Sequence, residues 1–314
     1  MFCRTPRKPR TALTLGLVLA VALGVEAMAQ AEPTYLPLKT PEVPVPVSDA
    51  AARANRPKIA PSKIILVGDS TTQVNSGWGG AFCAGHVAST LACVNLGRGG
   101  RSTHSYRAEG SWDLALAEAR TPGYETVYVL IQFGHNDQPG KPGNSTDIET
   151  EFGQNLTRFV EDARAAGAIP VLVTPLTRRA FVDGSLQDNL WPWAAKIRAV
   201  AGQTGAPLVD LHAASIAAVQ AMGAVASLEL TPGPPSPELI EAAKTGTTKP
   251  VPGAGLQTTP ALPRPGPDDI GPGARPATSF DYTHLGDKGA EFFAAQVARA
   301  LAAVAPDLRG KLAP

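Results

Sequence analysis

Short apolar runs alternate with amphipathic stretches along most of the chain after about residue 62. The apolar runs have the length of buried strands and lie at residues 63–67, 92–95, 127–133, 169–174 and 207–211. Apolar residues at helical spacing lie between and after them, at about 77–91, 149–166, 191–202 and 286–304. Strands that alternate with helices in this way predict a mostly parallel sheet covered by helices on both faces.

Two proline-rich segments interrupt the alternation. Residues 30–61 are rich in proline and alanine without periodicity, which is typical of an extended lead-in. Residues 231–278 are rich in proline and glycine and only 238–244 looks helical, so we expect an insertion or a mobile flap rather than a second domain. The predicted organisation is one α/β domain over 62–308 that carries this insertion.

The first 29 residues have the composition of a secretory signal peptide. Basic residues lie between positions 4 and 10, an apolar run covers 11–25, and Ala27-Met28-Ala29 is a small-x-small cleavage site. An uncleaved anchor is the alternative, although the apolar run is shorter than the about 20 residues that a membrane span needs. The basic part has no Arg-Arg pair, which favours the general export route. We therefore expect a periplasmic or extracellular protein, free of the membrane after cleavage before Gln30.

Cysteine usage and charge fit such a protein. Cleavage leaves Cys83 and Cys93, ten residues apart, and we expect a disulfide between them, with two buried thiols as the alternative. No histidine lies at a spacing that would complete a zinc site with them, so no metal is expected. The mature chain has a net charge near −2, which gives no reason to expect nucleic acid or an anionic membrane as a partner. One large domain and a monomer are expected.

Polar residues with catalytic potential follow several predicted strands. Ser70 comes directly after the first strand, within Gly-Asp-Ser-Thr at 68–71. A glycine-rich loop at 95–102 follows the second strand, and Gly-His-Asn-Asp at 134–137 follows the third. Asp-Tyr-Thr-His at 281–284 precedes the last helix. Because parallel strands end at the same edge of a sheet, we expect these loops to meet there.

A serine nucleophile needs a base, and His284 is the best candidate. Asp281 lies three residues earlier, so one turn can direct its carboxylate at one imidazole nitrogen while the other nitrogen faces Ser70. A capped turn with a surface histidine is the alternative. His104, beside the glycine-rich loop, is a candidate for substrate contact, and the other three histidines fit packing or loop bracing.

Acyl transfer also needs hydrogen-bond donors for the developing oxyanion. The N–H of Ser70, a glycine N–H of the second loop and the side-chain amide of Asn136 are suitable donors. Each donor of this kind is worth roughly 3 kcal/mol of transition-state stabilisation. Asp69, next to Ser70, fits a brace for the turn better than it fits the acid of a triad.

Together these blocks resemble the four motifs of the SGNH (GDSL-type) hydrolases, in the right order. Further details resemble the rhamnogalacturonan acetylesterase branch of the carbohydrate esterases. They are Gly77-Trp-Gly79, Ser105-Tyr106, Gln132-Phe-Gly-His-Asn-Asp137, Thr174-Pro-Leu-Thr-Arg-Arg179 and the Leu285 that follows His284. The resemblance covers roughly 64–301, without the lead-in and most of the insertion.

The resemblance implies a three-layer, flavodoxin-like fold with five parallel strands. It implies Ser70 as nucleophile, His284 as base and Asp281 as the group that orients the base. Gly100 and Asn136 would complete the oxyanion hole with the Ser70 N–H. No metal or organic cofactor is implied.

The implied reaction is removal of acetyl groups from plant cell-wall polysaccharide, most of all from rhamnogalacturonan or pectin. Arginines can grip uronate carboxylates and a tryptophan can stack on a sugar ring, although bonds to loop carbonyls and core packing are the plainer roles. With His104, the substrate-contact candidates are Arg101, Arg178, Arg179 and Trp78. An acetylxylan or other short-chain acyl esterase is one alternative function, and a non-catalytic glycan-binding protein is another.

Overall fold

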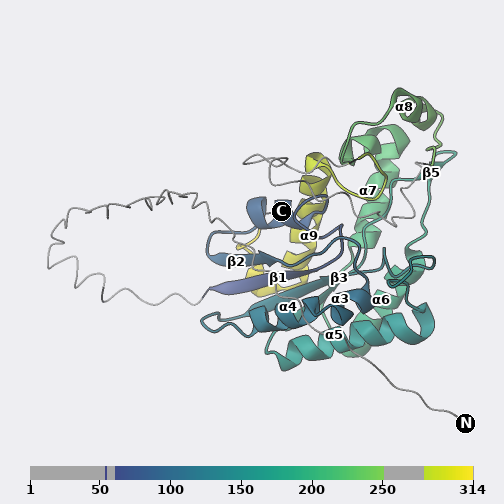
Figure 1. The fold of residues 1–314 in the computed structure, drawn as a ribbon. Coiled ribbons are helices and arrows are strands. Elements are labelled where there is room, and N and C mark those ends of the chain that lie inside the picture. The colour runs from purple at the N-terminus through teal and green to yellow at the C-terminus, as the bar shows by residue number, and fades with distance from the viewer. Residues whose placement is uncertain (1–53, 55–60, 251–278, 314) are drawn as a thin grey trace, which may run out of the picture. The chain divides into compact units, whose positions relative to one another are not determined.

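The structure is a computed structural model that describes residues 54, 61–250 and 279–313 (Figure 1). The predicted signal peptide, nearly all of the lead-in and the second half of the predicted insertion lie outside the described residues.

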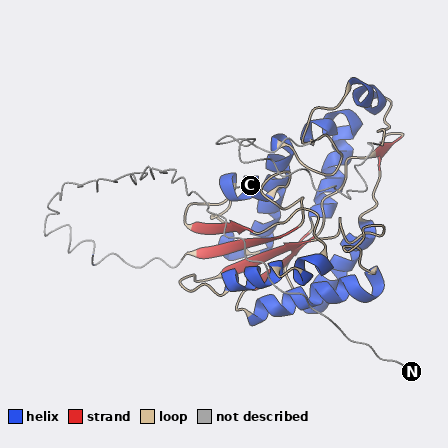
Figure 2. Ribbon diagram, in the orientation of Figure 1, coloured by secondary structure: helices blue, strands red, loops and turns tan. Residues whose placement is uncertain are grey.

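A five-stranded parallel sheet forms the centre of the described domain (Figure 2). Its strands, in the spatial order β2-β1-β3-β4-β7, are Leu91–Asn95, Ser62–Gly68, Val127–Gln132, Ile169–Val173 and Leu208–Val209. All neighbouring pairs are parallel, and β1, the second strand in this order, pairs with both β2 and β3. The predicted five-stranded parallel sheet is confirmed.

Helices cover both faces of this sheet, because alternate residues of each strand point to opposite sides. Ile64 and Leu66 of β1 belong to one buried cluster and Ile65 and Val67 to another. The first cluster is closed by α2, α7 and α9, at Gly79–Gly85, Leu211–Ala226 and Asp287–Val304. The second is closed by α3, α4, α5 and α6, at Thr103–Ala108, Ser111–Ala119, Gly153–Ala165 and Trp191–Thr204. In Figure 1 α3–α6 lie below the sheet and α7 and α9 above it, as a three-layer fold requires.

The helix expected at 77–91 is shorter than its sequence pattern indicates. It ends at Gly85, and the next residues return toward the sheet, where Ala88 donates from its N–H to the carbonyl of Lys311 (2.9 Å). Cys83 of α2 and Cys93 of β2 form the expected disulfide, with their Cα atoms 5.4 Å apart. The bond ties an edge strand of the sheet to the helix that precedes it.

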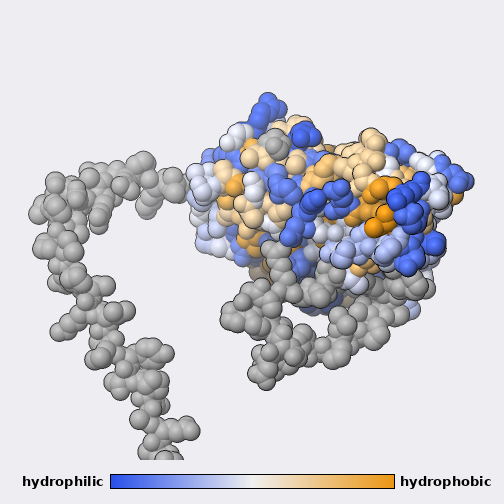
Figure 3. All heavy atoms as spheres, turned by 90° about the horizontal axis from the view of Figure 1, so that it is seen from above, coloured by the Kyte–Doolittle hydropathy of each residue, from blue (hydrophilic) through white to orange (hydrophobic). Residues whose placement is uncertain are grey.

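The helix α7 was not expected, since its alanine-rich sequence has little apolar periodicity. Leu211–Leu230, which is α7 with the 3₁₀ turn Ser227–Leu230, is long and apolar enough for a membrane span by length and composition alone. In the structure its Leu211 and Val219 pack into the core. The surface drawn in Figure 3 mixes polar and apolar residues rather than showing one uniform apolar face.

The first part of the predicted insertion packs against the domain. It contains α8 at Pro237–Lys244, as the sequence predicts, with Ala243 buried. The segment after α8 binds a small hairpin formed by β5 (Phe181–Val182) and β6 (Ser185–Leu186). Thr248 donates from its N–H to the Phe181 carbonyl (2.9 Å) and accepts from the Phe181 N–H (2.8 Å). The remaining short elements are the π turn Ile148–Phe152 before α5 and the 3₁₀ turn Pro306–Leu308.

Candidate active site

Ser70 lies in the tight turn that ends β1. A Cβ atom on Gly68 would meet Thr72 Oγ1 at 2.5 Å and the Gln132 carbonyl oxygen at 2.6 Å, so the strand can end here only with glycine. Oδ1 of the buried Asp69 accepts from the N–H and the hydroxyl of Thr71, both at 2.8 Å. Asp69 thus braces the turn, and Ser70 is left partly accessible at the carboxyl edge of the sheet.

The loop before α9 brings His284 and Asp281 to this serine. The distance from His284 Nε2 to Ser70 Oγ is 2.8 Å, and that from His284 Nδ1 to Asp281 Oδ2 is 2.6 Å. A carboxylate only accepts, so Nδ1 carries the proton in this contact and Nε2 has a lone pair for the serine hydroxyl. The three side chains therefore form one continuous hydrogen-bonded chain across more than two hundred residues of sequence.

The second oxygen of Asp281 holds the same loop in shape. Oδ1 accepts from the N–H of Thr283 (2.6 Å) and of His284 (2.7 Å). Burial alone would raise the pKa of the Asp281 carboxyl, but its bonds to His284 and Thr283 lower that pKa overall. Asp281 is therefore ionised in the form that best holds a protonated imidazole.

Arg179 supports the Asp281–His284 loop from inside the protein. Its side chain is fully buried, and its guanidinium donates to the carbonyls of His284 and, at 3.5 Å, of Thr283. Its backbone N–H donates to the Tyr282 carbonyl (2.9 Å). The prediction that Arg179 contacts substrate is wrong, because the side chain is fully buried and its terminal nitrogens face loop carbonyls inside the protein.

The glycine-rich loop after β2 packs onto the serine turn. Arg98 donates from its N–H to the Gly68 carbonyl (2.9 Å), and a Cβ atom on Gly97 would lie 2.7 Å from the Gln73 nitrogen. Gly100 has φ of +78°, a backbone conformation that side-chain-bearing residues seldom adopt, and it is exposed. The loop thus reaches close to Ser70 and ends in an exposed glycine.

The loop after β3 adds Asn136 to the same place. Its Nδ2 donates to the carbonyl of Arg101, the residue after Gly100, at 3.0 Å. Asp137 holds this loop in place. Its carboxylate is fully buried and accepts from the Thr103 and Gly134 N–H groups (3.0 and 3.1 Å). Burial raises the pKa of the Asp137 carboxyl to about 7, against the effect of these donors.

His135 lies beneath the loop and does not face solvent. Its Nδ1 is 3.6 Å from Oδ2 of Asp69, too long for a hydrogen bond but close enough for an ionic attraction whenever the imidazole is protonated. Burial lowers the pKa of His135, and the neighbouring Asp69 carboxylate partly opposes that effect. Neither ring nitrogen makes a hydrogen bond with a described residue, so the bracing role of His135 stays a prediction.

The amino-acid sequence matches a known protein family. Residues 66–226, about half of the chain, match the GDSL-like lipase/acylhydrolase family. The chain belongs to that family. The predicted membership of the SGNH/GDSL hydrolases is confirmed, and with it the prediction of a carboxylic ester hydrolase.

Two curated relatives are similar over about half of this chain. The rhamnogalacturonan acetylesterase RhgT of Bacillus subtilis (strain 168) is 38% identical over 172 residues, which are 52% of this chain and 70% of that protein. The probable rhamnogalacturonan acetylesterase YesY of the same organism is 30% identical over 160 residues, 49% of this chain and 72% of that protein.

A solved structure supports the fold of this GDSL-family chain. The crystal structure of the Bacillus subtilis protein YxiM matches with a TM-score of 0.54 and 21% identity. The match covers 77% of this chain and 56% of that one, so the chain spans little more than half the length of that protein.

Trp78 does not lie where a sugar can reach it. It is fully buried, and its Nε1 donates to the Gln132 side-chain oxygen (2.9 Å). The prediction of a stacking platform at Trp78 is therefore wrong. The same Gln132 oxygen also accepts from the Thr72 hydroxyl, so Trp78 and Gln132 tie the serine turn to β3.

The other predicted substrate contacts are more accessible but already have protein partners. Arg101 donates to the Gly99 carbonyl (2.8 Å) and to Glu109 (2.9 Å). His104 is exposed and lies 3.1 Å from a Glu151 oxygen. A substrate that bound either side chain would have to replace these protein partners.

Arg178 lies beside the loop that carries Asp281 and His284. Its Nε donates to the Thr283 hydroxyl (3.2 Å), and its two terminal nitrogens donate to Asn189 (2.6 Å) and to Gln138 (2.8 Å). A guanidinium has five N–H groups, so these bonds leave donors for a ligand. Arg178 is the best placed of the predicted arginines.

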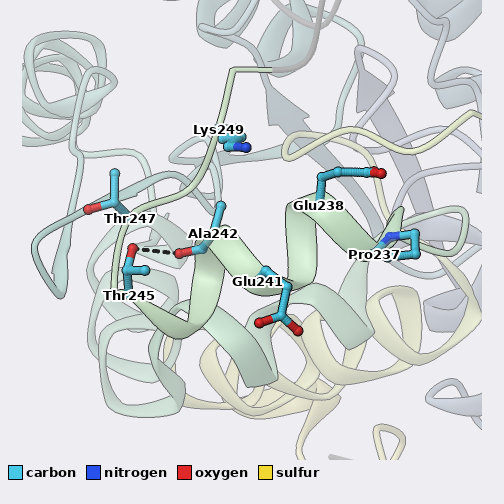
Figure 4. A pocket seen from close by; sticks show the side chains of 7 residues that line it. All are labelled: Pro237, Glu238, Glu241, Ala242, Thr245, Thr247 and Lys249. Atoms are coloured by element: carbon cyan, nitrogen blue, oxygen red, sulfur yellow. Dashed lines mark hydrogen bonds between the residues drawn. The ribbon is translucent and has the colours of Figure 1, made fainter.

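A hollow of about 560 Å³ lies over α8 and the segment after it (Figure 4). It is lined by Pro237, Glu238, Glu241, Ala242, Thr245, Thr247 and Lys249. None of the predicted site residues lines this hollow. Within the described ranges, no three or more His, Cys, Asp or Glu side chains gather as metal ligands.

Proposed function

We propose that this chain is a serine esterase that removes acetyl groups from plant cell-wall polysaccharide, with acetylated rhamnogalacturonan as its preferred substrate. The observation that carries the proposal is the hydrogen-bonded chain Ser70–His284–Asp281. The substrate class rests on the two relatives named as rhamnogalacturonan acetylesterases.

In the first half of the reaction, Ser70 Oγ attacks the acetyl carbonyl carbon while His284 Nε2 takes the hydroxyl proton. Asp281 stabilises the imidazolium that forms. The oxyanion of the tetrahedral intermediate is held by the N–H groups of Ser70 and Gly100 and by the Asn136 amide. The bond to the sugar oxygen then breaks, and that oxygen receives the proton from His284.

In the second half, water hydrolyses the acetyl-serine. His284 removes a proton from the water as its oxygen attacks the carbonyl carbon, and the same donors hold the new oxyanion. Acetate leaves when the bond to Ser70 Oγ breaks, and the proton on His284 returns to the serine. The enzyme is regenerated without a cofactor in any step.

Arg178 is the proposed contact for a uronate carboxylate of a pectic chain. Its fixed position beside Thr283, adjacent to the base, supports this role. A planar guanidinium can bind a carboxylate through two parallel hydrogen bonds, which a neutral xylan chain would not use.

We also propose that the protein is exported and acts outside the cytoplasm. The N-terminal pattern supports this, and so does the Cys83–Cys93 disulfide, because such bonds persist in oxidising compartments. N-terminal sequencing of protein recovered from the periplasm or the medium should begin at Gln30.

The nucleophile is tested with a serine-directed phosphonate. The probe should add its mass to the peptide that contains Ser70 and abolish hydrolysis of nitrophenyl acetate, and Ser70→Ala should neither react nor hydrolyse. Labelling of a different residue, or activity retained by Ser70→Ala, contradicts the mechanism.

The substrate is tested by acetate release. Acetylated rhamnogalacturonan, acetylated xylan and nitrophenyl acetate are compared at equal ester concentration. We expect the highest kcat/KM on rhamnogalacturonan, and a higher rate on xylan would instead assign the alternative acetylxylan esterase function.

A further inference from the structure

The side chain of Lys141 contacts Asn136 on the side away from the proposed oxyanion. Its Nζ donates to Asn136 Oδ1 (3.1 Å) and to the backbone carbonyl of His135 (2.8 Å). We propose that Lys141 is a positioning residue that fixes the direction of the Asn136 amide. The inference rests on the proposed function, since it concerns a donor of the oxyanion hole.

The argument begins with the two ends of the amide, which have similar shapes but opposite hydrogen-bonding roles. An ammonium group can only donate, so the amide atom that faces Lys141 must be oxygen. The Arg101 carbonyl can only accept, so the amide atom 3.0 Å from it must be nitrogen. Both neighbours therefore select the same orientation of Asn136, without relying on how its atoms are named.

This orientation is the one that the proposed chemistry needs. One of the two Nδ2 hydrogens goes to the Arg101 carbonyl, which leaves the other for an oxyanion. A cation against Oδ1 also draws electron density from the nitrogen end and makes that hydrogen a stronger donor. If the amide rotated by a half turn, it would present an oxygen lone pair to the developing negative charge.

The local backbone holds Lys141 in place. The loop closes on itself through Ser145, whose hydroxyl accepts from the Lys141 N–H (2.8 Å) and donates to the Gln138 carbonyl (2.9 Å). Burial lowers the pKa of the Lys141 ammonium and nearby Arg178 adds to this effect, while the Asp69 and Asp137 carboxylates oppose it. Lys141 is therefore partly buried, and its ammonium is held against two oxygens of the Asn136 loop.

The test replaces Lys141 by methionine, which keeps an unbranched stem without a donor. Hydrolysis of nitrophenyl acetate should show a fall in kcat of about tenfold or more with KM changed by less than about twofold, since one donor of such a site accounts for 10²–10³-fold in kcat. Lys141→Ala, which also lacks a donor, gives the same expectation if the methionine variant folds poorly. Lys141→Arg keeps a cationic donor and should restore most of kcat. Lys196→Met, which removes a surface ion pair with Glu149, is the matched control and should leave kcat unchanged.

A double-mutant cycle distinguishes positioning from a general structural effect. Asn136→Ala should lower kcat by about 10²–10³-fold, and adding Lys141→Met to it should have almost no further effect. An unchanged kcat in Lys141→Met, or multiplicative losses in the double variant, overturns the inference while Ser70-dependent hydrolysis by the wild type leaves the proposed function intact. Absence of Ser70-dependent hydrolysis in the wild type overturns both.

Discussion

The replacement Asp281→Asn separates the two tasks of this carboxylate. An asparagine can keep an oxygen toward the N–H groups of Thr283 and His284, which bind Oδ1 at 2.6 and 2.7 Å. Its NH₂ group then faces His284 Nδ1, where Oδ2 now lies at 2.6 Å. The imidazole must turn its other nitrogen into the donor, and Nε2–H points at Ser70 Oγ instead of accepting its proton.

The expected losses in catalysis and in stability differ greatly in size. A base in the wrong tautomer lowers kcat by about 10⁴-fold, which corresponds to about 5.5 kcal/mol. The two turn bonds change from charge-assisted to neutral, at about 1 kcal/mol each. The resulting loss of about 2 kcal/mol should lower Tm by about 4–8 °C for a domain of this size.

The assay is the initial rate with nitrophenyl acetate, followed together with thermal unfolding by circular dichroism. Glu161→Gln, an exposed carboxylate on α5, is the control and should match the wild type in both measurements. Asp281→Ala, which removes the turn bonds as well, should unfold at a lower temperature than Asp281→Asn. If Asp281→Asn keeps more than about a tenth of wild-type kcat while it remains folded, Asp281 does not set the tautomer of His284.

Two further predictions concern stability. Replacing Cys83 and Cys93 together by alanine frees a short loop and should lower the free energy of unfolding in urea by about 3 kcal/mol, so an unchanged midpoint contradicts a stabilising bond. Asp210 is half-buried, and although burial opposes the shift, Arg198 and the N-cap bond to Ala213 lower its carboxyl pKa in the folded state. Its contribution is therefore complete above about pH 4, the range of an unfolded carboxyl, and is lost as pH falls below that. Asp210→Asn should be less stable than the wild type at neutral pH, with the difference shrinking toward pH 3; a constant difference contradicts the assignment.

The strands and the residues that meet at Ser70 could be predicted because their signals are local. Runs such as 127–133 are apolar, short and rich in β-branched and aromatic residues, which favours a buried strand, and parallel strands bring their following loops to one edge. The roles of Ser70, Asp281 and His284 came from motifs and stay predictions until tested. Their geometry is nonetheless what those roles require.

Which of the candidate side chains are buried could not be predicted in the same way. Trp78 and Arg179 lie in motifs that carry site residues, yet both are fully buried, because their side chains bond to Gln132 of β3 and to the carbonyls of the Asp281–His284 loop, which are distant in the sequence. The sequence showed no sign of the role of Lys141 either, since a lysine among prolines and glycines is typical of an exposed loop. The helix α7 was missed because alanine satisfies a helix without an apolar stripe.

The anchoring of the Asp281–His284 loop has a consequence for how such a site can change over time. Besides Arg179, the body of the protein holds it through the Leu285 N–H, which donates to the Ser76 carbonyl (2.9 Å), and the Gly286 N–H, which donates to the Leu230 carbonyl (3.0 Å). Contacts with the rest of the described domain therefore hold His284 in position. A change in the length of the segment before the loop should therefore leave the distance between His284 and Ser70 unchanged, because the anchoring bonds all lie within the loop and the residues it packs against.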